Sequence, residues 1–280
     1  MRLILYCDIK GISLWQVVKV RLLIIPIVLL LLTTQVNIFS QNVSTYIFTQ
    51  TTGPYSSISG TSLTLESGSA DDGYYPLTNI GFTFNFHGSD FTQFSAATNG
   101  RIRLGAIGET STTNTPLSSY ANCIAFGGGD GKIVSSPIYL LSGSAPYRVL
   151  TIQYGPYYVY YSGTGDYVNV QIKLYETTNV IEIIYGTSVR SSTYTRQVGI
   201  SGATTSDFSV RTNSTSWVSS TAAGNNTTTM TWSTLYYPSN GLLYRWTPPP
   251  PPPLHHSRNS CYSYCFQYNI NGCRFVMDSG

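Results

Sequence analysis

The residues that could carry out catalysis are few. The predicted body of the chain contains a single histidine, His87, in the turn-like run His87–Asp90 between two aromatic segments. Nucleophilic catalysis needs a serine or cysteine next to a base that a third group orients, and no such motif surrounds this histidine. We therefore expect His87 to be an exposed turn residue, and we assign no catalytic residue to the chain.

Two other segments have the composition of ligand sites. Asp71-Asp72-Gly73 offers paired carboxylates for acid–base work or calcium, but aspartate and glycine are also turn formers, and calcium needs several more oxygen ligands at set spacing. Gly127–Gly131 has the glycines of a phosphate-cradling loop, but Lys132 follows without the serine or threonine of a P-loop. A turn and a loop are the favoured interpretations, and we expect no metal and no cofactor.

A cluster of tyrosines is the strongest candidate ligand site. Its members are Tyr154, Tyr157, Tyr158, Tyr160 and Tyr161. Aromatic faces stack on sugar rings, and tyrosine offers a large rigid contact with a polar tip. The Gly-Pro pair at 155–156 interrupts the strand pattern and suggests an exposed loop or an edge. The alternative is an ordinary sheet face, because strands are rich in tyrosine.

The cysteines do not form a disulfide framework or a zinc site. Cys7 lies in a predicted leader, Cys123 stands alone in the body, and the other three are in the tail, at Cys261, Cys265 and Cys273. A framework would place paired cysteines through the folded region. Zinc would need a second spaced pair beside the tail cysteines, and the adjacent histidines at 255–256 lack that separation.

Composition indicates an exported β protein. Charged residues make up 10% of the 280 residues and aromatic residues 14%, with a net charge of +3. An ordinary cytosolic enzyme has about 25% charged residues. The few basic residues are spread thinly, which argues against a nucleic-acid partner. The content of Thr, Ser, Gly and Tyr is typical of strands joined by many turns.

Period-two alternation identifies the strands that must position any site. Phe82, Phe84 and Phe86 alternate with polar residues, which predicts a half-buried strand. The same pattern covers residues 150–154, 168–174 and 181–185, and residues 198–201 and 208–211 form a predicted strand pair. No convincing helical repeat occurs. Because no proline-rich or charged linker divides the body, residues 41–247 are predicted to form one large, jelly-roll-like β-sandwich.

The N-terminus has the features of an export signal. The apolar run 22–32 follows Lys19 and Arg21 and is shorter than the ~20 residues that span a bilayer. We predict a signal peptide over residues 1–40, cleaved before Gln41, and no membrane span after cleavage. An uncleaved membrane anchor is the alternative. Residues 1–19 are a long preamble for such a leader, which suggests a start codon assigned too far upstream.

Several motifs together carry a resemblance to a known group of proteins. They are Ile80–Gly88, Phe91–Phe94, Thr98–Gly105, Pro146–Gln153, Val170–Glu182 and Gly241–Trp246. In order and spacing they resemble the N-terminal β module of secreted or cell-surface Bacteroidetes proteins, which often continue into fibronectin type III repeats and end in a type IX secretion sorting domain. The resemblance implies no general catalytic activity. It departs at Phe126–Gly131, where related modules carry an aromatic-acidic segment.

A proline run separates this body from the C-terminal tail. Residues 248–253 predict a stiff polyproline II linker. The tail, residues 254–280, changes composition abruptly, and we expect it to be unstructured because it is too short for its own core. Read one nucleotide forward, Met277-Asp278 would encode Trp, and the whole tail permits the start of a fibronectin type III repeat. The tail is thus a candidate for out-of-frame sequence.

These features predict an exported, non-enzymatic β-sandwich module. Adhesion, or binding of a glycan or a surface protein, is the leading function, in the secreted space or at the outer cell surface. One alternative is an accessory module of a secreted peptidase or glycoside hydrolase whose catalytic domain is missing. Another is an assembly subunit that adds strands to a partner. The sequence leaves the oligomeric state and the identity of the ligand open.

Overall fold

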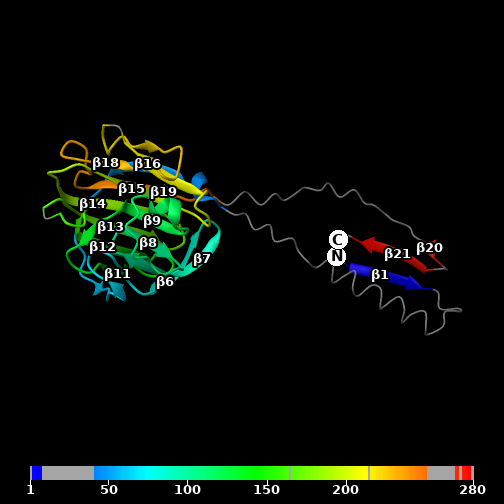
Figure 1. The fold of residues 1–280 in the computed structure, drawn as a ribbon. Coiled ribbons are helices and arrows are strands. Elements are labelled where there is room, and N and C mark those ends of the chain that lie inside the picture. The colour runs from blue at the N-terminus through cyan, green and yellow to red at the C-terminus, as the bar shows by residue number, and fades with distance from the viewer. Residues whose placement is uncertain are drawn as a thin grey trace. The chain divides into compact units, whose positions relative to one another are not determined.

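The computed structural model describes residues 2–7, 41–163, 165–213, 215–250, 269–270 and 273–278 (Figure 1). The chain divides into two compact units. One comprises Met1–Asn37 with Pro251–Gly280, and the other comprises Ile38–Pro250. Residues 8–40 and 251–268, which hold most of the predicted leader and the end of the proline run, lie outside the described residues. The predicted boundaries of leader, linker and tail therefore stay predictions.

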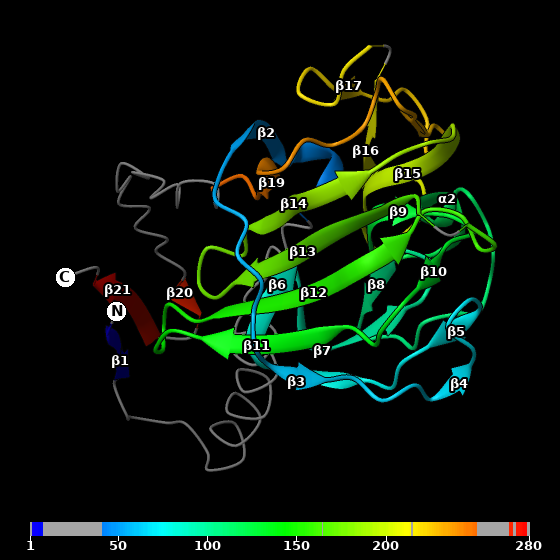
Figure 2. The same ribbon diagram turned by 90° about the vertical axis from the view of Figure 1, so that its left-hand side faces the viewer.

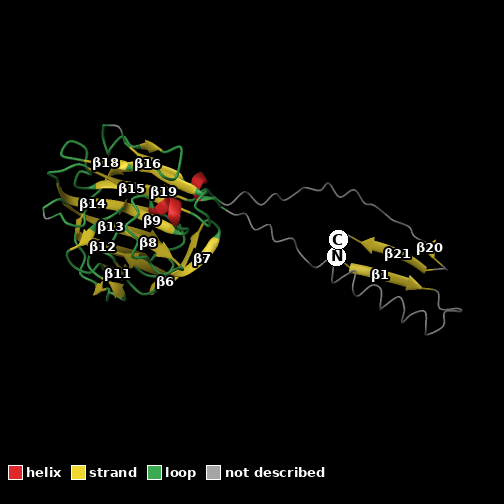
Figure 3. Cartoon of the chain, in the orientation of Figure 1, coloured by secondary structure: helices red, strands yellow, loops and turns green. Residues whose placement is uncertain are grey.

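The regular secondary structure of the larger unit is almost entirely β-strand, arranged in two antiparallel sheets that loops connect (Figure 3). The first sheet has the order β2-β19-β14-β13-β12-β11-β3, with β10 beside β12. Its strands are β2 (Ile47–Thr52), β19 (Leu242–Thr247), β14 (Ile181–Val189), β13 (Tyr167–Tyr175), β12 (Val149–Tyr158), β11 (Ile138–Ser142), β3 (Thr61–Ser62) and β10 (Lys132–Ile133).

The second sheet has the order β17-β16-β15-β9-β8-β7-β5-β4, with β18 beside β15 and β6 beside β7. Its strands are β17 (Thr221–Ala222), β16 (Phe208–Thr212), β15 (Tyr194–Ser201), β9 (Cys123–Gly128), β8 (Arg101–Leu104), β7 (Ser89–Ala97), β5 (Gly73–Tyr74), β4 (Ser67–Gly68), β18 (Met230–Trp232) and β6 (Thr78–Phe86). In this unit the described helices are two single turns, η1 (Val43–Thr45) and α2 (Pro116–Ser119).

The alternating side chains build the core between the sheets, as predicted. Phe82 and Phe84 on β6 are buried, whereas Thr83 between them is exposed, and Phe86 is fully buried as well. Val170, Ile172 and Leu174 on β13 are buried as well. Burying a large apolar side chain contributes about 1.5–3 kcal/mol, so these inward faces supply much of the stability. The prediction of an all-β sandwich is confirmed.

A strap formed by residues 53–60 crosses the outer face of the first sheet between β2 and β3. Gln171 alternates with inward-facing residues of β13 yet is only 2% exposed, because its Nε2 donates to the carbonyl oxygen of Ser56 at 2.7 Å. Ile58 N donates to Gln153 Oε1 at 2.9 Å. The ring of Tyr55 packs against Gly186, where a Cβ would lie 2.8 Å from the ring. The strap therefore explains the burial of outward-facing positions.

The register of the first sheet defines two ends. Ile47 lies opposite Thr247, and Gln41 Nε2 donates to Pro249 O at 3.0 Å, so the chain enters and leaves this unit at one end. Figure 2 shows β12 pointing away from that end, toward β10. Residues Tyr158, Tyr167 and Val189 are neighbours across β12, β13 and β14. We call their side of the sandwich the distal end.

The smaller unit is a separate antiparallel sheet with the order β1-β21-β20. Its strands are β1 (Arg2–Cys7), β20 (Asn269–Ile270) and β21 (Cys273–Asp278). Arg2 lies opposite Asp278, and Cys7 lies opposite Cys273. Two of these strands, β20 and β21, lie within the predicted tail. A segment too short to fold alone obtains its hydrogen bonds from a strand at the other end of the chain.

Candidate functional site

The predicted tyrosine cluster divides between the core and the surface. Tyr154 and Tyr157 are fully buried, and their hydroxyls donate to backbone carbonyls, Tyr154 to Arg101 O at 3.0 Å and Tyr157 to Gly127 O at 3.1 Å. A β-bulge between these two tyrosines shifts the register, so residues three apart face the same way. Tyr154 and Tyr157 therefore lie in the core, whereas Tyr158 and Tyr160 are half-buried and Tyr161 is exposed.

The exposed tyrosines belong to a continuous aromatic surface at the distal end. The rings of Tyr160 and Tyr194 are stacked, with centroids 5.1 Å apart and planes 18° apart. Tyr161 is 40% exposed, and its centroid lies 4.5 Å from that of Tyr160. We call these three residues the tyrosine platform. Tyr158, half-buried at the end of β12, is near them in the chain but has no described ring contact with them.

Sequence reasoning missed Tyr194. It begins β15, and no signal in the residues around it distinguishes it from other strand tyrosines. The pairing of β12, β13 and β14 brings the end of β14 next to the loop that holds Tyr160, and β15 starts a few residues later. Only the sheet order reveals this neighbour.

Three carboxylates gather beside the platform. One oxygen each of Asp71, Asp72 and Asp130 lies within 4.8 Å of the others, and all three residues are half-buried. Burial raises the pKa of Asp71, and the charges of Asp72 and Asp130 raise it further. Burial and the charge of Asp72 likewise raise the pKa of Asp130, although Arg196 opposes this. The cluster thus carries repelling negative charge.

Asn99 holds this acidic cluster together. Its Nδ2 donates to Asp72 Oδ1 and to Ser111 O, both at 3.0 Å, and its Oδ1 accepts from Gly131 N at 3.0 Å. The neighbouring Thr98 hydroxyl donates to Asp71 O. The sequence presented Asn99-Gly100 only as a turn; in the structure its buried side chain joins the hairpin of Asp71 to the loop of Asp130.

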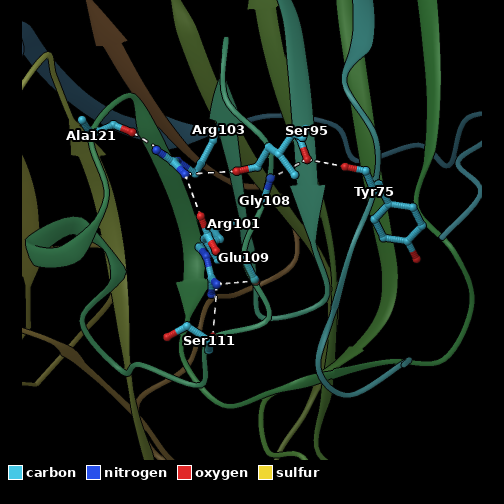
Figure 4. A network of polar contacts seen from close by, with 9 residues as sticks. Tyr75, Ser95, Arg101, Arg103, Gly108, Glu109, Ser111 and Ala121 are labelled. Carbon is cyan, nitrogen blue, oxygen red and sulfur yellow. Dashed lines mark hydrogen bonds and ion pairs between the residues drawn. The ribbon is translucent and has the colours of Figure 1, made fainter. Parts of the chain in front are cut away.

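A second polar network fastens the loop that follows β8 (Figure 4). Arg101 is fully buried, and its Nη2 donates to Glu109 O at 2.7 Å and to Ser111 O at 3.1 Å. Arg103 Nη1 donates to Ile107 O at 3.0 Å. On β7, the Ser95 hydroxyl donates to Tyr75 O and accepts from Gly108 N. These bonds fix the backbone of the loop in which the carbonyl oxygen of Ser111 accepts the hydrogen bond from Asn99.

Arg196 connects the acidic cluster to the platform. The residue is 4% exposed, and its Nη2 donates to Asp130 O at 2.8 Å while its Cζ lies 5.5 Å from the centroid of Tyr194. A hydrogen bond with Tyr160 and then the carboxylates of Asp130 and Asp71 raise the pKa of Tyr161. From its buried position, Arg196 therefore links the acidic cluster to the aromatic rings of the platform.

The acidic cluster by itself does not define a metal site. Calcium takes six to eight oxygen ligands, and three carboxylates supply only part of that set. One oxygen of Asp72 already accepts a hydrogen bond from Asn99. The carboxylates of the cluster instead provide hydrogen-bond acceptors next to the stacked rings of the tyrosine platform.

The other predicted motifs have structural positions. His87 is 6% exposed and not an exposed turn residue, because its Nε2 is 2.8 Å from Asn122 Oδ1 and its ring packs on Phe86 and Phe91. Gly127 packs against Trp232, and a Cβ there would lie 2.6 Å from the indole. The glycines of this run therefore serve packing in the core.

The fold defines a β-rich sandwich module. A family model described as NIDO related matches residues 45–248, and the chain belongs to that NIDO-related family. No curated protein and no solved structure matches the chain. Within the residues that the structure describes, no helix has the length and apolar character of a membrane span.

Proposed function

We propose that this chain is an exported, non-enzymatic binding module that takes a glycan on its tyrosine platform. The observation that carries the proposal is the stacked, partly exposed group of Tyr160, Tyr161 and Tyr194 beside the carboxylates of the distal end. Aromatic rings cover the apolar faces of sugars. The nearby carboxylates accept hydrogen bonds from sugar hydroxyls, and bonds to charged groups are the stronger kind.

The position of the platform supports a role in display. The chain enters and leaves the sandwich at the end where Ile47 lies opposite Thr247, and the platform is at the other end. A module attached to a cell surface or to neighbouring domains through those residues would present its tyrosines outward. Fibronectin type III repeats after the proline run would fit this arrangement.

A panel of neutral and acidic oligosaccharides tests the proposal. Tyr161→Ala and Tyr160→Ala should each weaken binding by about two- to tenfold, since stacked aromatic contacts are worth about 0.5–1.5 kcal/mol beyond their area burial. Tyr147→Ala is the matched control, because Tyr147 is 74% exposed but lies between β11 and β12 at the opposite end. Binding that survives both platform substitutions, or that Tyr147→Ala weakens equally, would reject the site.

A further inference from the structure

Arg190 carries a hydrogen-bonding edge that no group in its surroundings uses. It follows β14 at the distal end, and its Nη1 donates to Tyr167 O at 2.6 Å and to Val189 O. Its Nε and Nη2 are shielded from solvent and have no acceptor. These two nitrogens form the side of the guanidinium that binds a carboxylate in bidentate fashion.

The neighbours of Arg190 are aromatic or already engaged. Its Cζ lies 4.6 Å from the ring centroid of Trp232, whose Nε1 also has no acceptor. The nearest acid is Asp166, whose Oδ1 accepts from the hydroxyl of Ser191 at 2.7 Å and whose Oδ2 accepts from the amide of Ser192 at 2.9 Å. Among the described residues, no ion pair includes Arg190.

A shielded cation of this kind does not stabilise the fold. Burial lowers the pKa of Arg190 to about 10, which records the cost of removing its charge from water. A shielded charge without an anionic partner destabilises a fold, and an apolar side chain in its place would avoid that cost. An anion arriving at the free edge would supply the missing partner.

We propose that the Nε–Nη2 edge of Arg190 anchors the carboxylate of an acidic sugar, such as a uronic acid, whose ring stacks on the tyrosine platform. This inference rests on the proposed glycan function. Arg190 lies over the ring of Trp232, Trp232 is the β-sheet partner of Tyr194, and Tyr194 stacks on Tyr160, so Arg190 lies close to the platform.

The acidic cluster and Arg190 are held by different residues. Arg196 on β15 donates to Asp130 O, whereas Arg190, which follows β14, lies over the ring of Trp232. A uronate with its carboxylate at Arg190 would keep its hydroxyls free to donate to the carboxylates of the acidic cluster.

Because Nε and Nη2 of Arg190 are shielded from solvent, a ligand reaches them only when neighbouring groups move. Tyr237, whose charge acts on Arg190, is 42% exposed, and Leu235 in the same loop is 79% exposed. Side chains with so little burial lose few contacts when they shift. We therefore expect ligand binding to displace the loop of residues 233–238.

The test compares oligogalacturonate with its methyl ester, which has the same rings without the charge. We expect the wild-type protein to bind the acid at least about tenfold more tightly than the ester, because paired charge-assisted hydrogen bonds are the strong ones. Arg190→Gln should reduce acid binding to the level of the ester and leave ester binding unchanged. Arg190→Lys keeps the positive charge but loses the paired N–H donors of the guanidinium. It should therefore lose most of the preference for the acid over the ester.

Lys173→Gln is the matched control, because it removes a positive charge from an outward-facing position of β13. It should leave both affinities unchanged. Equal affinity of the wild-type protein for the acid and the ester would overturn the inference. This outcome needs no variant, so the test does not depend on whether Arg190→Gln folds. If the ester then still binds and Tyr161→Ala weakens that binding, the glycan function stands and only the role of Arg190 is rejected.

Discussion

Removing one charge from the acidic cluster should stabilise the protein. In Asp71→Asn the repulsion from Asp72 and Asp130 disappears. Two unit charges 4.8 Å apart repel by about 0.9 kcal/mol at the dielectric constant of water and by about 3.5 kcal/mol at an effective value of 20. Because these residues are half-exposed and salt screens them, we expect a net gain of about 1 kcal/mol at pH 7.

The gain should depend on pH. Folding raises the pKa of Asp71 above its ordinary value of 3.8, so the folded protein holds this proton more tightly than the unfolded chain does. The wild-type protein therefore loses stability as the pH rises from 3.8 through the folded pKa. The advantage of Asp71→Asn should be largest at pH 7 and should shrink toward pH 4.

Urea unfolding at several pH values, in buffer free of divalent metal, measures this difference. A gain of 1 kcal/mol also corresponds to about 2–4 °C in Tm for a domain of this size. Asp72→Asn is the control, because it removes a charge but disturbs the hydrogen bond from Asn99 and should gain less. If Asp71→Asn is less stable than wild type at pH 7, or if its advantage does not change with pH, the repulsion argument is wrong.

Two further predictions concern an ion pair and a glycine. The Arg148 guanidinium, whose Nε lies 2.8 Å from Glu176 Oε2, lowers the pKa of that carboxyl from 4.5 to about 2. The stability from this pair is present above pH 4.5 and lost as the pH falls toward 2, so acid titrations of unfolding should show this loss in wild type but not in Glu176→Gln. Gly127→Ala should cost about 1–3 kcal/mol in urea unfolding, because its Cβ would lie 2.6 Å from Trp232. Gly224→Ala, where a Cβ meets nothing within 4 Å, should cost little, and equal costs would contradict the packing argument.

Local pattern predicts the strands but not their irregularities. The burial of Phe82, Phe84 and Phe86 could be predicted, because the alternation of apolar and polar residues indicates which face of a strand is buried. Tyr157 was not, because the bulge after Tyr154 reverses the side to which the alternation points. A bulge at Gly-Pro is suggested by sequence, but the side of the sheet to which each ring then turns is fixed only by the strand pairing.

The site depends on neighbours that are distant in the chain. Asp71 and Asp130 meet because one buried side chain, Asn99, bonds to both of their loops. Its sequence context is that of an ordinary Asn-Gly turn. His87 was misplaced for the same reason, since its partner Asn122 directly precedes a distant strand, β9. Long-range pairs of this kind cannot be recognised from the composition or the hydrophobic periodicity of the sequence.

The adjacency of Ile47 and Thr247 also determines how the module bears force. When tension acts through residues 42 and 249, it reaches the two strands at the end where they begin to pair. The bonds between β2 and β19 are perpendicular to the strands and would then open one rung after another, as in a zipper, instead of resisting together in shear. Such a module begins to unfold at low force, at the end where Ile47 pairs with Thr247. The loops at its far end stay unloaded until β2 has separated from β19.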